Sequence, residues 1–377
     1  MFLHIIGDEK FIDFAIEQFE FVAEQQNRFI LLYENELSKV GFIRNSNKIE
    51  LCRVGSDDYN LLLLEATSYE AIFIHYLDNS KIRFINECPG RLNFVWMFWG
   101  QDAQKMYVDK PYLPLTFRVV RKIFGWNEYL WPYTNWIRRL YLSKTERGKA
   151  MKKIRYCAPV IKEEFDLLTR KLSLNYKYLE FNYGSIESNF RDVQNGGLTG
   201  NNILVGNSST VTSNHADVFV SLKKQDLGGR KIIVPLSYGN HRYRDLIVEM
   251  GKEMFGDNFI PIVDFVPLSE YNAILGSCRH VVMNHLRQQA LGNIQISLWR
   301  GSKVYMNESS ILYKSLTNQG YIIFNTRDLE MHLINDEVLS EEMVEHNRRL
   351  LIRGYGKETT LNRTRVIVDH FLKGASL

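Results

Sequence analysis

The sequence is poor in cysteine, and its four cysteines show no grouping that would suggest a metal site or a disulfide framework. They are scattered along the 377-residue chain without a Cys-x-x-Cys pair, at Cys52, Cys88, Cys157 and Cys278. Paired cysteines at regular spacing are the usual signature of zinc sites and of disulfide-stabilised secreted domains. We therefore expect neither, and the usage fits a reducing compartment.

Long apolar runs are also missing. No stretch approaches the roughly 20 apolar residues that a membrane-spanning helix requires. The apolar run that begins at Phe2 is short and is followed at once by Asp8, which does not resemble a secretory signal. We expect a cytoplasmic protein. Its length suits two domains of ordinary size, and its 45% hydrophobic content is enough for two cores.

Two chemical motifs are absent as well. No Gly-x-Gly-x-x-Gly sequence follows an expected strand, which disfavours dehydrogenase chemistry. No convincing Asp-x-Asp motif for a metal-bound diphosphate is present either. We therefore expect no cofactor and no obligatory metal ion.

Positive charge is present but uneven. The net charge is only +4, yet residues 110–156 interleave many lysines and arginines with large aromatic side chains. The residues of interest here, together with Trp99 upstream, are Arg118, Arg121, Lys122, Trp126, Trp131, Trp136, Arg138 and Arg139. Such a segment suits an anionic bilayer surface. It also suits nucleic acid, on whose bases the rings would stack, or a helical pair that packs on its own domain and leaves a solvated basic face.

Apolar runs alternate with helical periodicity in both halves of the chain. This pattern favours an α/β protein built of two doubly wound, Rossmann-like sheets. In the first half the expected strands are 2–7, 29–33, 71–77 and 92–99. In the second half they begin at 203, 231, 259, 280, 303 and 321. Residues 191–202 are rich in glycine and asparagine, so they are the expected linker between a first domain, 1–190, and a second, 203–345, with helices at 346–377.

A strand, a glycine loop and a helix follow one another at residues 203–222. Gly206 allows close approach of the backbone to a ligand, and the free amides of such a turn favour an anion, usually a phosphate. An ordinary strand-to-helix turn would look the same. In a doubly wound sheet, however, ligands bind beyond the carboxyl ends of the strands, where this half of the chain supplies Gly206, Asn207, Ser208, Asn214, Ser237, Tyr238, Gly239, Arg287, Gln288, Gln289, Asn307 and Glu308. With Tyr271 on the next expected helix, this set predicts a site for a nucleotide-linked donor.

Four stretches carry a family resemblance. Residues 94–102, 203–208 with Asn214 and His215, 234–239 and 287–289 resemble, in order and spacing, the 4-acetamido-4,6-dideoxygalactose (Fuc4NAc) transferases of enterobacterial common antigen synthesis. The resemblance implies a GT-B glycosyltransferase, in which two Rossmann-like domains face an interdomain cleft. In that fold the second domain binds the nucleotide sugar, the first binds the acceptor, and a terminal helix often crosses back. The family moves the sugar from a dTDP donor to a disaccharide carried on undecaprenyl diphosphate, at the cytoplasmic face of the cell membrane.

Sugar transfer needs a stabilised leaving group and a base for the acceptor hydroxyl. We expect helix-terminal amides and Arg287 to take the charge of the diphosphate. Asp102, just past a strand end and beside Trp99, is the expected base, with Asp8 and His75 as reserves. An N-cap role for Asp102 and a core position for His75 are the structural alternatives.

Two other classes of protein remain open. Another sugar-nucleotide enzyme of the same fold, with a UDP or GDP donor or with epimerase activity, would share the donor residues and need no membrane surface. A nucleic-acid-binding protein would use the basic aromatic segment, but it would leave the two sheets without a purpose, so we expect no nucleic acid partner. The expected partners are a nucleotide sugar, a polyprenyl-diphosphate-linked glycan and the inner membrane surface.

Overall fold

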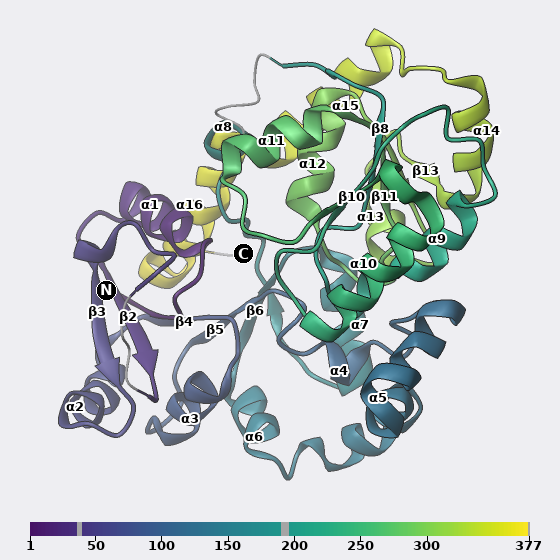
Figure 1. Ribbon diagram of the computed structural model, residues 1–377. Coiled ribbons are helices and arrows are strands. Elements are labelled where there is room, and N and C mark those ends of the chain that lie inside the picture. Colours follow the sequence, from purple (N-terminus) through teal and green to yellow (C-terminus); the bar gives the residue numbers. More distant parts are fainter. Residues whose placement is uncertain (36–39, 190–195, 376–377) are drawn as a thin grey trace. The chain divides into compact units, whose positions relative to one another are not determined.

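The structure, a computed structural model, describes residues 1–35, 40–189 and 196–375. Of the expected linker 191–202, residues 196–202 are therefore described and 191–195 are not. The chain forms two compact units, each with one parallel sheet between helices (Figure 1). Unit 1 comprises Met1–Tyr107, Asn135–Asn189 and Gly354–Leu377, and unit 2 comprises Val108–Thr134 and Phe190–Arg353.

Unit 1 holds a seven-stranded parallel sheet in the order β3-β2-β1-β4-β5-β6-β7. Its strands are β1 (Phe2–Ile6), β2 (Asn27–Tyr33), β3 (Ile49–Arg53), β4 (Ala71–His75), β5 (Phe94–Phe98), β6 (Tyr156–Pro159) and β7 (Lys177–Tyr178). The continuous apolar runs in the sequence correctly predict β1, β2, β4 and β5, which are buried on both faces. The edge strand β3 lacks such a run because three of its five side chains are exposed.

The helices of unit 1 cover both faces of this sheet. They are α1 (Ile12–Val22), α2 (Asp57–Glu65), α3 (Asn79–Glu87), α4 (Gln104–Tyr107), α6 (Glu146–Lys153), α7 (Lys162–Leu172), α8 (Ile186–Asn189) and α16 (Lys357–Lys373). The last of these returns from the far end of the chain and packs against α1. Ile367 and Val368 of α16 join the same buried core as Phe19 of α1. Gln18 also donates a hydrogen bond to Thr364 (3.3 Å).

Unit 2 holds a six-stranded parallel sheet in the order β10-β9-β8-β11-β12-β13. The strands are β8 (Asn202–Val205), β9 (Ile232–Pro235), β10 (Phe259–Ile262), β11 (Cys278–Met283), β12 (Lys303–Met306) and β13 (Phe324–Asn325). The helices are α9 (His215–Leu222), α10 (His241–Phe255), α11 (Leu268–Gly276), α12 (Leu291–Arg300), α13 (Ile311–Asn318), α14 (Leu329–Asn335) and α15 (Glu341–Tyr355). All six expected strands are present, and the doubly wound architecture is confirmed for both units.

Helix α5 (Pro114–Leu142) changes direction at Gly125, whose φ of 72° and ψ of −166° interrupt the helical backbone. Its first part packs on the core of unit 2 through Val119, Ile123 and Phe124. The sequence placed all of 110–156 in the first domain, whereas the contacts assign Val108–Thr134 to unit 2. The apolar stripe of this helix explains the assignment, since it is buried against the second core.

All four cysteines lie buried, three in unit 1 and Cys278 in unit 2. Burial raises the pKa of the Cys278 thiol to about 12. No described helix combines the length and the apolar character that crossing a bilayer would require.

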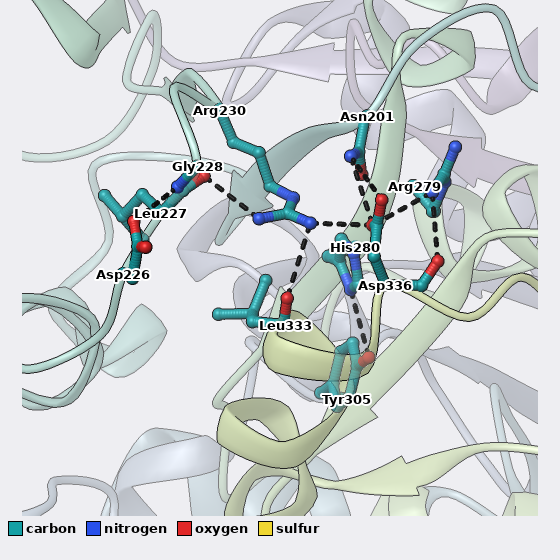
Figure 2. Close-up of polar contacts among 10 residues, drawn as sticks. All are labelled: Asn201, Asp226, Leu227, Gly228, Arg230, Arg279, His280, Tyr305, Leu333 and Asp336. Carbon is teal, nitrogen blue, oxygen red and sulfur yellow. Dashed lines mark hydrogen bonds and ion pairs between the residues drawn. The ribbon is translucent and has the colours of Figure 1, made fainter.

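An ionic cluster holds the amino ends of three strands of unit 2 together (Figure 2). The Asp336 carboxylate accepts hydrogen bonds from Arg230 Nη2 (2.7 Å) and Arg279 Nη1 (3.0 Å). It also accepts one from Asn201 Nδ2 (3.2 Å). These partners precede β9, begin β11 and precede β8, so the cluster ties the sheet to the end of α14 at the edge opposite the predicted donor loops.

Candidate active site

In unit 2 the strand order reverses between β8 and β11, and the carboxyl ends of these two strands carry Gly206 and Asn284. Ligands of doubly wound sheets bind at such a point. Gly206 has a φ of 70°, and a Cβ atom there would lie 2.5 Å from His215 Nε2. Only glycine therefore fits at this position without displacing the histidine.

Three predicted donor residues from three separate loops form one hydrogen-bond network. Asn207 donates through Nδ2 to the Tyr238 hydroxyl (2.8 Å). Its Oδ1 accepts from Gln289 Nε2 (2.8 Å). Gln289 in turn accepts through Oε1 from Thr212 Oγ1 (2.7 Å). The network fixes neutral amides and hydroxyls around the strand ends, as recognition of a sugar or a ribose requires.

The loops that follow β8 and β9 are joined by backbone contacts. Ser209 and Gly239 form a parallel bridge, and the Ser209 amide donates to the Tyr238 carbonyl (2.8 Å). Gly239 has a φ of 120°, and a Cβ there would lie 2.7 Å from the carbonyl carbon of Ser209. Ser208 Oγ lies 2.9 Å from Thr210 Oγ1. Ser237 precedes this bridge and is partly exposed.

Arg287 and Gln288 lie between β11 and α12. The Arg287 side chain is buried, and its Nη1 donates to the Gln288 carbonyl (2.8 Å). Ala290, in the left-handed region with a φ of 61°, turns the chain into α12, whose first amides have no partner within the helix. A buried guanidinium beside a helix amino terminus is suited to a diphosphate.

Three further predicted residues lie on the neighbouring elements. Tyr271 accepts through its hydroxyl from Asn293 Nδ2 (2.9 Å) at the start of α12. Asn307 donates to Asn284 Oδ1 (3.4 Å), which connects β12 to the same edge. Glu308 instead pairs with Arg327 and accepts from Asn325 Nδ2 (3.1 Å).

Asn214 is used within the protein. Its Nδ2 donates to the carbonyls of Asn284 (2.9 Å) and Thr212 (3.1 Å), and its Oδ1 accepts from the Leu113 amide (2.9 Å). It adopts a left-handed conformation with a φ of 54°. The Asn214 side chain therefore holds the loop after β8 against the end of β11 and the residues before α5.

Sequence reasoning missed His285, which follows directly after Asn284. Its side chain is fully buried, and neither ring nitrogen has a hydrogen-bond partner. Burial holds the pKa of His285 well below its usual value, and the Arg287 charge lowers it further. Its place at the strand end was visible in the sequence, but its burial was not.

In unit 1, Asp102 is a buried carboxyl group at the carboxyl end of β5. Its Oδ2 accepts from Trp96 Nε1 (2.7 Å) and from the Leu77 amide (3.1 Å). Its Oδ1 is buried without a hydrogen-bond partner. Burial raises the pKa of Asp102 to about 6, opposed by these hydrogen bonds and by Arg147.

Arg147 lies next to Asp102 and stabilises the same strand ends. Its Nη1 donates to the carbonyls of Leu77 and Asp102 (2.9 Å each). A second cation, Lys81, is fully buried and pairs with Asp78 at the start of α3. The carboxyl edge of the unit 1 sheet therefore holds buried charges of both signs.

The two reserve candidates for the base, Asp8 and His75, both make hydrogen bonds within the protein. The Asp8 carboxylate accepts from the amides of Gly41 (2.6 Å), Phe42 (2.9 Å) and Ile43 (3.2 Å), and so anchors a loop. His75 is fully buried in β4. Its Nε2 lies 3.1 Å from His4 Nδ1, and its Nδ1 lies 2.8 Å from the Tyr183 hydroxyl. Burial holds the pKa of His75 well below its usual value, so the imidazole is neutral.

The predicted basic aromatic residues differ in exposure. Arg118, Arg121 and Lys122 are exposed on the first part of α5, and Arg138 is exposed on its second part. Trp126 and Trp136 are 65% and 59% exposed.

Two members of that set have local contacts, and one cannot be described. Arg139 donates through Nε to the Met106 carbonyl (2.7 Å). Trp99 packs edge-on against Phe11 and Tyr183, with ring centroids 5.6 Å apart in each pair. The side chain of Trp131 lies outside the described residues.

Comparison with known proteins gives one family and several similar structures. The sequence model of the 4-alpha-L-fucosyltransferase family, glycosyl transferase group 56, matches residues 185–352, which include every predicted donor residue. This match confirms the resemblance over that segment.

Similar solved structures cover nearly the whole chain. A glycosyltransferase from Rickettsia africae ESF-5 has a TM-score of 0.64 at 10% identity over 99% of both chains. A sucrose-phosphate synthase from Thermosynechococcus elongatus has a TM-score of 0.66 at 7% identity over 99% of both chains. AviGT4, a glycosyltransferase involved in avilamycin A biosynthesis, has a TM-score of 0.53 at 10% identity over 100% of this chain and 99% of that one. At these identities the similarity concerns the fold, and it confirms the expected GT-B type.

Proposed function

We propose that this chain, a glycosyltransferase of the GT-B fold, moves a deoxyamino sugar of the Fuc4NAc type from a dTDP donor to a glycan carried on undecaprenyl diphosphate. The observation that carries the proposal is the network of Asn207, Tyr238 and Gln289 beside the buried Arg287. It lies at the switch point of unit 2, within the segment that matches the fucosyltransferase family.

The donor would bind with its diphosphate between the Gly206 loop and the start of α12. There the backbone amides and the Arg287 guanidinium supply the positive charge that the leaving group needs as its bond to the sugar breaks. Tyr238, a residue that is 53% exposed, offers a ring face for the nucleobase. We propose transfer without an obligatory metal ion, since these groups supply the required charge themselves.

Asp102 is the proposed base in unit 1. A carboxyl group whose pKa lies near 6 is ionised at neutral pH and basic enough to take a proton from a hydroxyl group. Both carboxylate oxygens of Asp8 accept hydrogen bonds from backbone amides, and His75 has no exposed surface. Both are therefore weaker candidates for the base.

A lipid-linked acceptor requires the enzyme to contact the cytoplasmic face of the cell membrane. The exposed basic face of α5 supports such a contact. Arg118, Arg121 and Lys122 lie one turn apart at most, and Trp126 follows them. Cations meet lipid phosphates while an indole ring sits at the headgroup level.

Nucleotide binding is the first test. Thermal-shift titrations with dTDP, UDP and GDP, each with and without magnesium, should show a selective stabilisation by dTDP that needs no metal. Selective binding of UDP or GDP would keep the reaction class and change the donor. Transfer of the sugar from dTDP-Fuc4NAc to a polyprenyl-diphosphate-linked disaccharide then tests the acceptor, and turnover of the nucleotide sugar without any lipid acceptor would favour an epimerase.

Membrane association has its own test. Sedimentation with vesicles containing phosphatidylglycerol should retain the wild-type protein and lose the R121E/K122E variant. The matched control is K223E/K224E, which reverses two adjacent exposed lysines of the same unit. Equal sedimentation of both variants with the vesicles would contradict a membrane role for α5.

A further inference from the structure

The beginning of helix α5 is capped by a residue from another helix. The Leu115 amide donates to Asp217 Oδ1 (3.0 Å), and the Thr116 amide donates to Asp217 Oδ2 (2.9 Å). The Thr116 hydroxyl adds a third bond to Oδ2 (2.7 Å). Orphan amides at a helix start are usually satisfied by a neighbouring residue in the sequence. Here the cap comes from α9, and all of these residues lie within unit 2.

The same helix start is connected to the donor loop. The Leu113 amide donates to Asn214 Oδ1 (2.9 Å), and Asn214 donates to the Thr212 carbonyl (3.1 Å). Thr212 in turn holds Gln289, whose amide contacts Asn207 (2.8 Å). An unbroken chain of contacts therefore leads from the first residues of α5 to the donor network.

Asn214 is the residue that joins the start of α5 to the donor loop. It is a non-glycine residue in the left-handed region, which persists only where surrounding contacts hold it. One of its three side-chain hydrogen bonds comes from Leu113, so movement at the start of α5 bears directly on the conformation of the loop between Gly206 and Asn214.

The two faces of α5 have different partners. Val119, Ile123 and Phe124 pack on the core of unit 2, whereas Arg118, Arg121 and Lys122 are exposed. A bilayer bound at the basic face would therefore hold the helix at one side while Asn214 and Asp217 hold its start.

We propose that binding of an anionic bilayer at α5 and binding of a nucleoside diphosphate at the donor loop strengthen each other, through Asn214 and Asp217. The inference rests on the proposed function for both ligands and adds the coupling between them. Immobilising the start of α5 orders Asn214 and its loop in advance, so the nucleotide loses less conformational freedom when it binds. Because such coupling is reciprocal, nucleotide must strengthen vesicle binding by the same factor. The enzyme would thus hold its donor most tightly where its acceptor is found.

The experiment is a binding cycle on the full chain. The Kd for dTDP is measured by calorimetry in buffer, with phosphatidylcholine vesicles, and with vesicles that also contain phosphatidylglycerol. We expect about a five-fold or larger decrease in Kd with the anionic vesicles only, which is the lower end of typical coupling. Hydrogen exchange of the amides between Gly206 and Asn214 should slow when anionic vesicles are added without nucleotide.

Asp217→Ala is the decisive variant. It should bind dTDP in buffer within about two-fold of wild type and still sediment with vesicles, but the two affinities should become independent. Asp226→Ala is the matched control, because Asp226 also accepts a backbone amide, that of Gly228 (2.9 Å), on the same unit. Should Asp217→Ala fail to fold, Thr116→Val removes one of the three bonds to Asp217 and should reduce the coupling.

The outcomes separate the two proposals. Failure to bind dTDP, or failure to bind anionic vesicles, overturns the corresponding part of the proposed function and the coupling with it. Binding of both with unchanged affinities overturns the coupling alone. Retention of full coupling in Asp217→Ala also overturns it, since the cap that holds the start of α5 would then be unnecessary.

Discussion

The carboxyl edges of the two sheets differ in chemistry although the sheets share one architecture. In unit 2 the buried part of the edge consists mainly of neutral amides and hydroxyls, joined through Asn207 and Gln289, with Arg287 as a buried cation. In unit 1 the edge holds the buried carboxyl group of Asp102, the buried cation Lys81 and the partly buried Arg147. The fold sets where ligands bind, and the side chains at the edge set which charge is tolerated there.

We propose that binding of a diphosphate explains this difference. It requires donors and positive charge, which the unit 2 edge provides, and the one carboxylate among its predicted donor residues, Glu308, is exposed and paired with Arg327. A general base works best when its pKa lies near the working pH, and burial has raised the pKa of Asp102 in unit 1 to about 6. In this proposal unit 2 binds the charged part of the substrate and unit 1 carries out the proton transfer, and each half can be tested by substitution.

The largest expected effect comes from Asp102→Asn. Loss of a general base should lower kcat by about 10²–10⁴-fold. The Kd for dTDP should stay unchanged because Asp102 lies in unit 1. In the wild type, kcat/KM should fall as the pH drops below about 6, where Asp102 becomes protonated. An unchanged kcat would remove Asp102 from the mechanism.

The same variant separates catalysis from stability. The folded-state pKa of Asp102 is raised, so its contribution to stability is full below the unfolded pKa and is lost as the pH rises through about 6. Asp102→Asn lacks this dependence. Its free energy of unfolding should therefore improve relative to wild type by about 2–3 kcal/mol between pH 4 and pH 7.5, as denaturant titrations would measure. A merely structural role would instead make the variant both inactive and unstable at pH 7.5.

The next largest effect should come from Arg287→Ala. Removing a charge-assisted contact to the diphosphate should weaken dTDP binding by about 10–100-fold. Arg287→Lys keeps the charge without the fork of donors, and its effect should lie in between. Thymidine, which has no phosphate, is the control ligand. If its affinity fell as much as that of dTDP, Arg287 would be acting on the loop and not on the phosphates.

A smaller effect is expected from Gly206→Ala. The added methyl group meets His215 Nε2 in a left-handed backbone conformation. The variant should lose about 1–3 kcal/mol of unfolding free energy. Gly292→Ala is the control, because no atom lies within 4 Å of a Cβ at that position in α12. Equal losses in both variants would argue against the close approach at Gly206.

The smallest effect concerns the opposite edge of the unit 2 sheet. Asp336 is about half exposed, so Asp336→Ala should cost only about 1 kcal/mol. The pKa of Asp336 is lowered, first by the hydrogen bond from Arg230, so its stabilisation is present above the unfolded pKa and is lost as the pH falls through the lowered value. Nucleotide binding should not change, since this cluster lies away from the donor loops. Weaker dTDP binding in the variant would show that the amino ends of the unit 2 strands are not independent of the donor loops at their carboxyl ends.

Much of this organisation could be predicted from the sequence, because parallel strands are buried on both faces and appear as apolar runs. The runs before Gly206 and Ser237 located the loops that form the donor network. Strands β3, β6 and β7 were missed, since the edge strand β3 exposes three of its five side chains and short strands such as Lys177–Tyr178 do not stand out from loops.

What the sequence could not reveal are contacts between distant residues. The pattern of Val119 and Ile123 indicates a buried helical face, but not which core buries it. The bond of Asp217 to Thr116 joins residues 101 positions apart, and nothing local marks either partner. Likewise, the sequence suggested Asp102 as a base or as a helix N-cap, but it could not show that its carboxyl group accepts hydrogen bonds from Trp96 and Leu77.

The buried cysteines allow the local unfolding of each unit to be measured separately. Cys278 is the one cysteine of unit 2, and burial keeps its thiol protonated and enclosed in the folded state. A thiol reagent can modify it only when the sheet around β11 opens, so the labelling rate measures that opening directly. Cys52, Cys88 and Cys157 do the same for unit 1. Native labelling kinetics followed by peptide mapping would thus show whether the two units open together or separately, without any added probe.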